Sequence, residues 1–360
     1  MEKKSVLVDL YALRNPYCGL GQVADNYLRQ LCSYAESGRA DKEGIEFTVL
    51  VPKGFVCKEP GYERLKQVKY HKIHKFLPRL LPKADLWHST DQFFKAWRSD
   101  VPQLLTVHDL NFLKEKAPER AVQYLRKITR RVNRCTTLAV ISHFVADDVS
   151  RHIDLRGRKP EVIYDGVEDL TAKPAERPAF VREGRPFFFT IGQVVKKKNF
   201  RSLVPLMKHF SGHDLYICGQ PGTDVPEIES RVASMQLDNV FLPGPISNAE
   251  KIWMYRHCSA FLFPSLLEGF GLPVVEAMQF GIPVFTSNCS SIPEVAGGYS
   301  FIWDSFDPEA MVALMEKELP GFAERTDFIR DMKHYAVSRF TYERNFEEYL
   351  ALYRKMLGLA

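Results

Sequence analysis

The chain has 360 residues and a formal net charge of +5, with 45% hydrophobic and 26% charged residues. These values suit a soluble protein with two cores of ordinary domain size. No apolar run is long enough to span a membrane, and the N-terminus passes from two lysines straight into a short strand-like stretch, so no signal peptide is expected.

Cysteine usage and the distribution of charge narrow the range of partners. The seven cysteines contain no CxxC pair, which indicates reduced thiols in a cytosol and disfavours a cysteine-bound metal. Residues 1–180 contain 31 Lys and Arg against 23 Asp and Glu, a balance of +8, whereas the remaining 18 and 21 give −3. No nucleic-acid-binding module is visible, so nucleic acid is not expected as a partner.

In the first half of the chain, short apolar runs alternate with amphipathic stretches. This pattern predicts parallel strands at 5–10, 46–51, 85–88, 103–107, 137–141 and 161–163. Helices are expected near 21–37, 118–134 and 142–152. Residues 1–170 are therefore predicted to form one doubly wound α/β domain.

One segment of this half, residues 64–83, mixes many cations with Phe76, Leu77, Leu80 and Leu81. Such a segment could rest on an anionic membrane surface with its apolar side chains in the interface. It could equally be a solvated basic face beside an ordinary strand, because its two prolines disfavour a long amphipathic helix.

The second half repeats the alternation after a stretch rich in proline and charge, residues 171–186, which is predicted to be a linker. Strands are expected at 187–191, 214–218, 240–242, 260–263 and 284–286. Residues 187–340 are therefore predicted to form a second α/β domain. Residues 341–360 have a helical pattern.

The run SLLEGFGLPVVEAMQFGIP begins at Ser265 and places Glu268 and Glu276 eight positions apart. One continuous helix would put both acids on one face, but Gly269-Phe270-Gly271 argues against such a helix. Pro273 suits the first turn of a helix, where its missing N–H is no loss. We therefore expect Glu268 in a loop and Glu276 one turn inside the helix.

The start of that helix is expected to present the backbone N–H groups of Gly271 and Leu272. Such groups and the helix dipole attract an anion, and a phosphate would suit them. Glutamates on either side would repel a phosphate but can accept hydrogen bonds from hydroxyls. A phosphate between hydroxylated groups describes a sugar nucleotide. The alternative is that Glu268 and Glu276 are ordinary solvated glutamates beside a glycine loop.

The run EGFGLPVVEAM, followed by GIPVFTSNCSSIPEVAGG, resembles the donor-site signature of the retaining glycosyltransferases of family 4. The resemblance covers nearly the whole chain and is strongest over residues 187–301. It implies the GT-B fold, in which two Rossmann-like doubly wound parallel-sheet domains face each other across a cleft and a last helix, here 341–360, returns to the N-terminal domain. It also implies a nucleotide-sugar co-substrate, retention of the anomeric configuration, and no metal or other cofactor.

The resemblance also assigns roles to particular residues. It places Glu276 on the ribose hydroxyls and Glu268 on hydroxyls of the transferred sugar. His108, at the end of a predicted strand, is placed at the reacting centre with support from Asp109. Outside the resemblance, a strand-end histidine is usually structural, and His88 and His143 are kept as structural or acceptor-side residues.

Further donor contacts are implied at the glycine-rich run Cys18-Gly19-Leu20-Gly21-Gln22, which follows the first strand and opens a helix. Considered alone, a G-x-G run is a weak signal and is more often a tight turn. The loop before the second glutamate contributes the remaining donor-binding positions. The predicted donor contacts of these two segments are Gly19, Gly21, Phe270, Gly271 and Leu272.

Two positions depart from the family pattern. The family usually has Arg where Gln193 stands and Lys where Lys198 stands, both at the donor diphosphate. Gln lacks the charge and the bidentate fork of Arg, so charge neutralisation would rest on Lys198, the helix start and the neighbouring lysines 196 and 197. At Asp165 the family commonly has Asn before the glycine, and either residue suits a left-handed turn, which indicates a structural role.

The expected function is a metal-independent, retaining hexosyl transfer of mannosyl or glucosyl type. The donor would be GDP- or UDP-linked, and the acceptor would be a hydroxyl of a glycan or lipid-linked glycan. The expected setting is bacterial polysaccharide biosynthesis in the cytoplasm, with peripheral contact to the inner face of the membrane.

Other functions of the same fold stay open: a nucleotide-sugar epimerase, a sugar phosphorylase, or a binding protein without turnover. A nicotinamide-dependent oxidoreductase is disfavoured because no G-x-G-x-x-G opening is followed by a suitably spaced acid.

Overall fold

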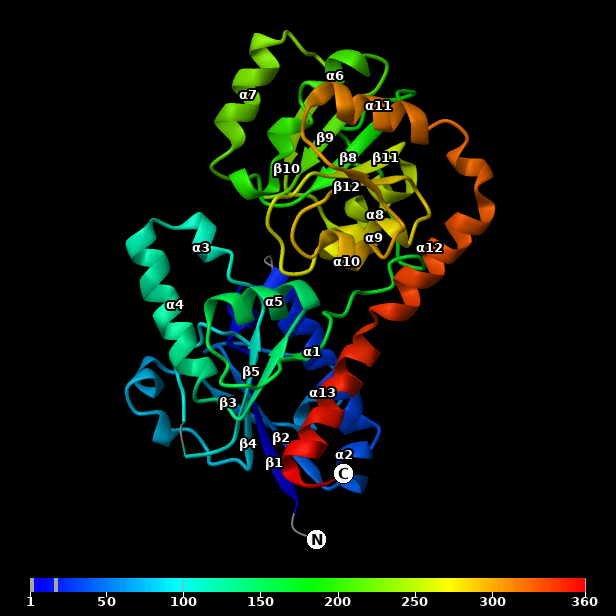
Figure 1. Ribbon diagram of the computed structural model, residues 1–360. Helices are drawn as coiled ribbons and strands as arrows, with labels where there is room; N and C mark the ends of the chain where they lie inside the picture. Colours follow the sequence, from blue (N-terminus) through cyan, green and yellow to red (C-terminus); the bar gives the residue numbers. More distant parts are fainter. Residues whose placement is uncertain (1–2, 16–18, 99, 360) are drawn as a thin grey trace. The chain divides into compact units, whose positions relative to one another are not determined.

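The computed structural model describes residues 3–15, 19–98 and 100–359. The chain divides into two compact units (Figure 1). The first unit combines residues 1–166 with 340–360, and the second comprises residues 167–339. The proline-rich segment expected to be a linker therefore belongs to the second unit, where Arg182 pairs with the buried Asp214.

Within the described residues, the first unit contains a seven-stranded sheet in the order β3-β2-β1-β4-β5-β6-β7. Every neighbouring pair is parallel. The strands are β1 (Lys4–Asp9), β2 (Ile45–Val51), β3 (Lys66–Lys69), β4 (Leu86–Ser89), β5 (Gln103–Val107), β6 (Thr137–Val140) and β7 (Glu161–Val162). All the strands predicted in this half are present, and β3 is an additional one. Its sequence KQVK is polar and largely exposed at the sheet edge, which is why apolar periodicity did not reveal it.

The three helices predicted at 21–37, 118–134 and 142–152 are present, and each observed end lies within two residues of the predicted one. The α-helices are α1 (Gly19–Glu36), α2 (Arg39–Lys42), α3 (Phe112–Glu115), α4 (Pro118–Val132), α5 (His143–His152) and α13 (Tyr342–Leu357). The 3-10 turns are η1 (Tyr11–Arg14), η2 (Tyr62–Arg64), η3 (Lys72–Lys75) and η4 (Pro78–Leu80).

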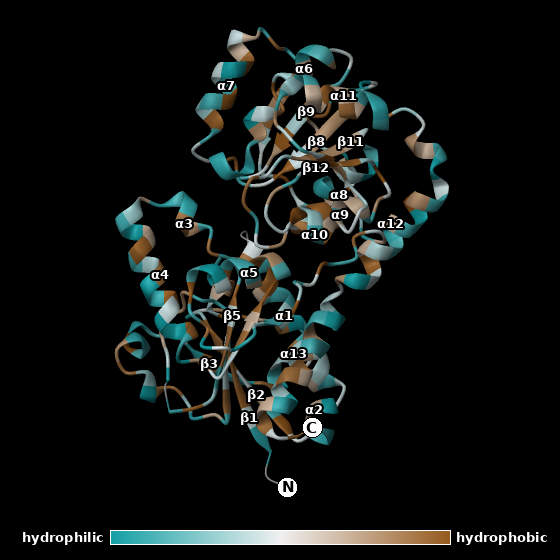
Figure 2. Ribbon diagram, in the orientation of Figure 1, coloured by the Kyte–Doolittle hydropathy of each residue, from teal (hydrophilic) through white to brown (hydrophobic). Residues whose placement is uncertain are grey.

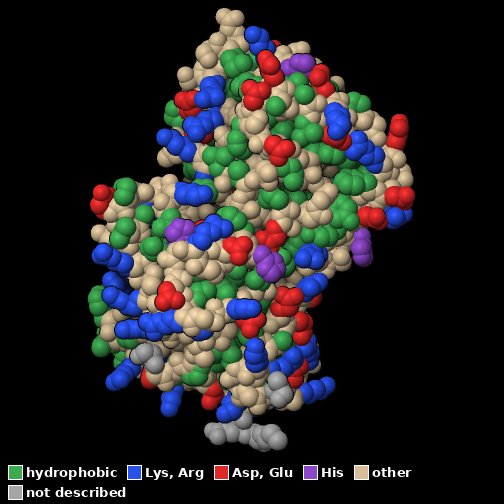
Figure 3. All heavy atoms as spheres, viewed as in Figure 1, with side chains coloured by type: hydrophobic (Ala, Val, Ile, Leu, Met, Phe, Trp, Pro, Cys, Tyr) green, Lys and Arg blue, Asp and Glu red, His purple; other side chains and the backbone are tan. Residues whose placement is uncertain are grey.

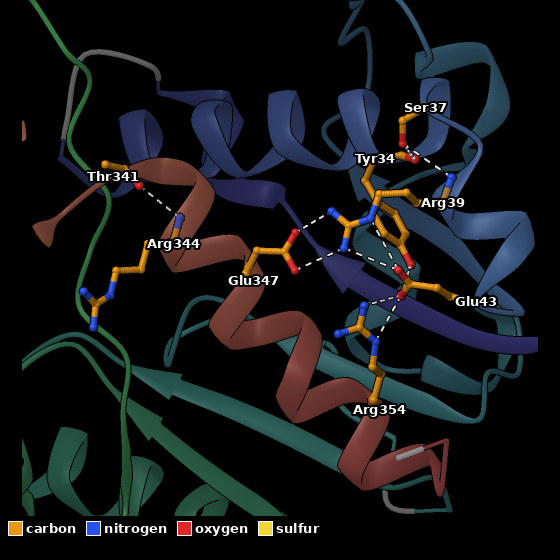
Figure 4. A network of polar contacts seen from close by, with 8 residues as sticks. All are labelled: Tyr34, Ser37, Arg39, Glu43, Thr341, Arg344, Glu347 and Arg354. Atoms are coloured by element: carbon orange, nitrogen blue, oxygen red, sulfur yellow. Dashed lines mark hydrogen bonds and ion pairs between the residues drawn. The ribbon is translucent and has the colours of Figure 1, made fainter. Parts of the chain in front are cut away.

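The last helix, α13, belongs to the first unit, where pairs of opposite charge fix it (Figure 4). Arg39 Nη1 lies 2.5 Å from Glu347 Oε1, and its Nη2 lies 3.2 Å from Oε2. Arg354 pairs with Glu43 on the other side of the same network. A bidentate guanidinium–carboxylate pair constrains orientation as well as distance. The network therefore fixes the register of α13 against α1 and α2.

The second unit contains, among the described residues, a six-stranded parallel sheet in the order β10-β9-β8-β11-β12-β13. The strands are β8 (Phe187–Ile191), β9 (Asp214–Cys218), β10 (Val240–Gly244), β11 (Ala260–Phe263), β12 (Val284–Ser287) and β13 (Phe301–Trp303). Five of them were predicted. The sixth, β13, has only three residues, which is too short for a periodic pattern.

The helices of the second unit are α6 (Leu206–His209), α7 (Val225–Ser234), α8 (Asn248–His257), α9 (Leu272–Met278), α10 (Ile292–Ala296), α11 (Pro308–Glu318) and α12 (Thr326–Arg339). Its 3-10 turns are η5 (Lys196–Lys198), η6 (Phe200–Ser202) and η7 (Phe322–Glu324). Hydrophobic residues are concentrated along the strands, and the helices are mixed in character (Figure 2). Both sheets are thus covered by amphipathic helices, as a parallel sheet requires.

Each sheet has one point at which the strand order reverses, between β1 and β4 and between β8 and β11. In open parallel sheets, ligands bind outside the carboxyl ends of the strands at such a point. Beside this point in the second unit, the chain approaches itself closely at the ends of β8 and β9. A Cβ atom on Gly219, after β9, would lie 2.1 Å from the carbonyl oxygen of Gly192, after β8. The fold therefore requires glycine at this strand end.

Candidate functional site

In the second unit, the loops that leave β8 and β11 meet at the reversal point. Lys198, in the turn η5, places its Nζ 2.5 Å from Oε1 of Glu268, and each side chain is 14% exposed. The two loops are also tied through Lys197, whose carbonyl oxygen accepts hydrogen bonds from Leu266 N–H at 2.7 Å and Ser265 Oγ at 3.2 Å. The expected phosphate-binding lysine and the expected sugar-binding glutamate thus lie in direct contact.

Glu268 is held by serines that the sequence prediction did not include. Ser265 Oγ donates to Glu268 Oε1 at 2.7 Å, and the backbone N–H of Glu268 donates to Ser290 Oγ at 3.0 Å. Ser291 Oγ donates to the carbonyl oxygen of Phe270 at 2.9 Å. Ser290 and Ser291 lie in the NCSSIPE stretch after β12. Polar residues between a strand and a helix were the one sequence feature that could have indicated their role.

The glutamate loop ends at Gly271, which has a φ of 114° and precedes α9. A side chain at this φ would be strained, so the turn requires glycine. Pro273 lies in the first turn of α9, and Glu276 lies inside the helix, so the predicted loop and helix are confirmed. Phe270 is 3% exposed. Its contribution to any ligand would therefore come from its backbone.

Glu276 likewise contacts a lysine and a tyrosine through its carboxylate. Its Oε1 lies 2.7 Å from Lys251 Nζ, and its Oε2 accepts a hydrogen bond of 3.0 Å from Tyr255 OH. Lys251 and Glu276 side chains are each 13% exposed. Burial, and secondarily the negative charge of Glu276, raises the pKa of Tyr255 well above its usual range, so the hydroxyl keeps its proton. Lys251 and Tyr255 lie on α8, which carried no recognised motif.

The residue that departs from the family pattern is accessible. Gln193 is exposed, directly after Gly192 at the end of β8. Lys196 is exposed as well, whereas Lys197 is half-buried and the Lys198 side chain is only 14% exposed. Only Lys198 of these three reaches the glutamate cluster in the ion pairs of the described residues. The three lysines are therefore not interchangeable.

In the first unit, His108 follows β5 and is fixed by two hydrogen bonds. Its backbone N–H donates to Gln92 Oε1 at 2.9 Å, and its Nε2 lies 2.7 Å from the carbonyl oxygen of Thr90. Because a carbonyl oxygen only accepts, Nε2 carries a proton and donates it to this hydrogen bond. Asp109 Oδ1 accepts from Asn111 N–H at 2.9 Å, which shapes the turn after His108.

A small pocket adjoins His108. Asp165, 6% exposed, lines it from the turn that was predicted to be structural. Burial raises the pKa of Asp165 to about 6, and the nearby His108 partly counteracts this rise. The structure thus places Asp165 beside the candidate reacting histidine, which its sequence position did not indicate. The pocket is lined by Leu20, Val23, Ala24, Tyr27, His88, Thr90, Thr106, His108, Asp165, Asn345 and Tyr349.

A buried polar network supports this pocket. His88 Nδ1 lies 2.6 Å from Tyr353 OH, and its Nε2 lies 2.9 Å from Thr106 Oγ1. Thr106 Oγ1 is in turn 3.0 Å from Tyr349 OH. Burial lowers the pKa of His88 to about 3, so the ring is neutral at physiological pH. His88 is accordingly structural, whereas His143 is exposed at the start of α5.

The glycine-rich run lies partly outside the described residues, since Cys18 is not among them. Gly19 and Gly21 form the first turn of α1, where Gly19 is exposed and Gly21 is buried. The predicted helix start is confirmed. The sequence analysis did not single out Asp9, which ends β1. Its side chain is fully buried, and its Oδ2 has no hydrogen-bond partner among the described residues. Burial raises the pKa of Asp9 well above its usual range.

Comparison with known proteins bears on both units. Residues 30–169 match the model of the "Glycosyltransferase Family 4" domain. Residues 173–334 match the model described as "Glycosyl transferases group 1". The two matches are adjacent and correspond to the two units. The second match contains Lys198, Glu268, Glu276 and Lys251.

Among curated proteins, the chain is similar to two kinds of bacterial mannosyltransferase. It is 28% identical over 200 residues to the O-antigen chain mannosyltransferase RfbU of Salmonella typhimurium, and the aligned region covers 54% of each chain. It is 38% identical over 96 residues to the serotype-specific mannosyltransferase WbdA of Escherichia coli, covering 27% of this chain and 11% of that protein. The chain thus spans about half of the first relative's length and a small part of the second's.

Among solved structures, the chain resembles Anabaena Alr3699/HepE in complex with UDP and glucose, with a TM-score of 0.72 and 14% identity. The match covers 98% of this chain and 99% of that one. At this identity the likeness establishes the fold.

Proposed function

We propose a donor, a mechanism and an acceptor class for this chain, which belongs to the family 4-type glycosyltransferases and has the GT-B fold. It transfers a mannosyl-type hexose from a GDP- or UDP-linked donor to a hydroxyl of a glycan or lipid-linked glycan. The observation that carries the proposal is a set of two largely buried ion pairs. Lys198–Glu268 joins the loops after β8 and β11, where the strand order of the second sheet reverses, and Lys251–Glu276 joins α8 to α9. They supply the donor-binding chemistry that the EGFGLPVVEAM run implied.

The proposed contacts follow from the chemistry of each group. Glu276 accepts hydrogen bonds from the ribose hydroxyls, and Glu268 accepts from hydroxyls of the transferred sugar, because carboxylates accept but do not donate. Lys198 and the backbone before α9 bind the diphosphate. A glycosyl phosphate bond that breaks leaves negative charge on the diphosphate, and a fixed cation stabilises that charge in the transition state. In the resting site, Glu268 holds Lys198 in position for this role.

The first unit supplies the remaining groups. His108, with its tautomer fixed by Thr90, meets the transferred sugar. Gly19 and Gly21 at the start of α1 allow close approach to the donor. The anomeric configuration is retained by a front-face route in which the leaving phosphate takes the acceptor proton, and the reaction requires no metal.

The identity of the sugar is proposed from the relatives. Both curated relatives described above are named as mannosyltransferases, and RfbU acts on an O-antigen chain by its name. A mannosyl donor and a cell-surface glycan acceptor are consistent with this. Polysaccharide assembly would place the chain in the cytoplasm, in peripheral contact with the inner face of the membrane.

A thermal-shift titration with UDP-, GDP- and ADP-sugars and with NAD, each with and without EDTA, tests the proposal. A ligand that binds only the folded state raises its stability by mass action. A shift with one nucleotide sugar that is unaffected by EDTA supports the class and names the donor. Turnover of the donor without an acceptor would favour an epimerase or phosphorylase, and tight binding without any turnover would favour a non-catalytic binding protein.

A further inference from the structure

The first unit carries an exposed apolar cluster formed by Ile73, Phe76, Leu77 and Leu80. These side chains are 50%, 72%, 53% and 59% exposed, respectively. They lie on and between the 3-10 turns η3 and η4, which follow the edge strand β3. All eight large hydrophobic residues that are exposed in the described part of the chain belong to the first unit, and half of them form this cluster.

The cluster is held outward by its own neighbours in the sequence. His74 and Leu81 are buried at 8% and 2% exposure, and Leu81 packs in a core group that contains Tyr70 and Phe94. His74 Nδ1 accepts a hydrogen bond of 3.1 Å from the His71 backbone N–H. The centroids of the His74 and Tyr70 rings lie 5.7 Å apart in an edge-on arrangement. The two buried residues anchor the turns to the core. Phe76, Leu77 and Leu80 between them, and Ile73 just before His74, are left exposed to solvent.

The surroundings of the cluster are strongly basic. Residues 64–83 contain seven Lys and Arg and no Asp or Glu. Lys72, Lys75, Arg79 and Lys83 are exposed, and Lys75 Nζ lies 4.8 Å from the Phe76 ring. Figure 3 shows that Lys and Arg side chains also gather over the α4 region of the same unit. Exposed apolar side chains with exposed cations next to them in the sequence match an anionic lipid interface, which offers hydrocarbon beneath negative headgroups.

We propose that residues 72–83 dock the chain on an anionic membrane surface. Phe76, Leu77 and Leu80 enter the interface, while Lys72, Lys75 and Arg79 contact the lipid phosphates. Long cationic side chains reach headgroups while apolar neighbours lie deeper. Among the described residues, no helix is long and apolar enough to cross a bilayer. The proposal deepens the proposed function, since a lipid-linked acceptor lies at such a surface, but the contact itself requires no glycosyl transfer.

Flotation of the purified full chain with vesicles tests the proposal. Vesicles of phosphatidylcholine alone are compared with vesicles in which about a third of the lipid is phosphatidylglycerol, because anionic lipid supplies the electrostatic attraction. The expected result is binding to the anionic vesicles at least about tenfold stronger than to the neutral ones, with loss at high salt. Weak binding that ignores both lipid charge and salt would overturn the proposal.

Variants locate the contact. Phe76→Ser with Leu77→Ser is expected to lower binding at least about tenfold, because both side chains enter the interface. Val56→Ser is the matched control, since Val56 is 77% exposed but lies outside the cluster. Equal loss in the control, or unchanged binding of the double variant, would overturn the assignment.

Other occupants of the surface give different results. If the cluster covers a second copy of the chain, the double variant changes the oligomeric state in gel filtration and leaves vesicle binding unaltered. If it covers an acidic protein, the chain does not float with any vesicle. A preserved nucleotide-sugar thermal shift in the double variant shows that it is folded. Failure of docking with a preserved shift leaves the proposed reaction intact, whereas docking without any shift would count against the reaction alone.

Discussion

Lys198 Nζ and Glu268 Oε1 lie 2.5 Å apart although they are 70 positions apart in the sequence. The contact joins the loops after β8 and β11, where the strand order of the second sheet reverses. Both side chains are largely buried, so each charge depends on the other for compensation.

The first prediction concerns this ion pair. Lys198→Ala removes the cation from the mostly buried Glu268, which keeps its hydrogen bond from Ser265, and is expected to lower the free energy of unfolding by about 1–3 kcal/mol. It is also expected to lower transfer activity by about a hundredfold or more, because the diphosphate loses its fixed cation. Thermal denaturation and initial rates measure the two effects. The exposed Lys196, changed to Ala, is the control, and an equal effect there would contradict the assigned role of Lys198.

The second prediction separates the two glutamates. Glu276→Ala is expected to weaken binding of UDP or GDP itself about tenfold, because the ribose loses its acceptor. Glu268→Ala is expected to leave nucleotide affinity within about twofold and to weaken only the intact sugar nucleotide about tenfold. Calorimetric titration of each variant measures both constants. Equal affinities in both variants and the unchanged protein would refute the assignment, and the exposed Glu316→Ala serves as the control.

The third prediction concerns Gln193, which by the sequence resemblance stands where the family usually has arginine. Gln193→Arg adds an exposed guanidinium after β8 and is expected to tighten nucleotide diphosphate binding about fivefold to thirtyfold, in a salt-dependent way. Gln123→Arg adds the same charge on α4 and is the control for a general effect of net charge. Unchanged affinity of the first variant would mean that Lys198 and the backbone already neutralise the diphosphate.

The fourth prediction concerns the pH dependence of stability through Asp165. Its pKa is about 6 in the folded chain against an ordinary value of 3.8, so the folded state holds the proton more tightly than the unfolded state. Below about pH 4, Asp165 is protonated in both states and does not lower the free energy of unfolding. As the pH rises towards and through 6, its ionisation lowers that free energy. The loss is on the order of 2–3 kcal/mol at neutral pH.

Asp165→Asn removes the ionisation and is expected to raise the free energy of unfolding at pH 8 while leaving it nearly unchanged at pH 4. Denaturant unfolding at both values measures the difference. Asp147→Asn, on the exposed face of α5, is the control and should alter neither value. A variant that is less stable at pH 8 would show that the carboxylate is compensated by a group in the pocket.

Much of the fold could be predicted because it depends on local patterns. Buried parallel strands such as FFFTI at 187–191 and AFLF at 260–263 are continuous apolar runs, and these two were predicted with correct bounds. The helix start at Pro273 and the glycine at 271 follow from backbone restrictions that act within a few residues. The strands β3 and β13 have no such local pattern, and they were therefore not predicted.

The candidate site also has a part that local sequence determines and a part that it does not. The sequence by itself determined that Glu268 lies in a loop, that Glu276 lies one turn into a helix, and that both flank a glycine, since these are properties of neighbouring residues. Only the tertiary structure decided which groups face them: Lys198 for the first, and Lys251 with Tyr255 for the second. The tertiary structure likewise decided that Asp165 lies beside His108. Ion pairs and buried hydrogen bonds act through space, and the sheet order that brings their members together leaves no periodic signal in the chain.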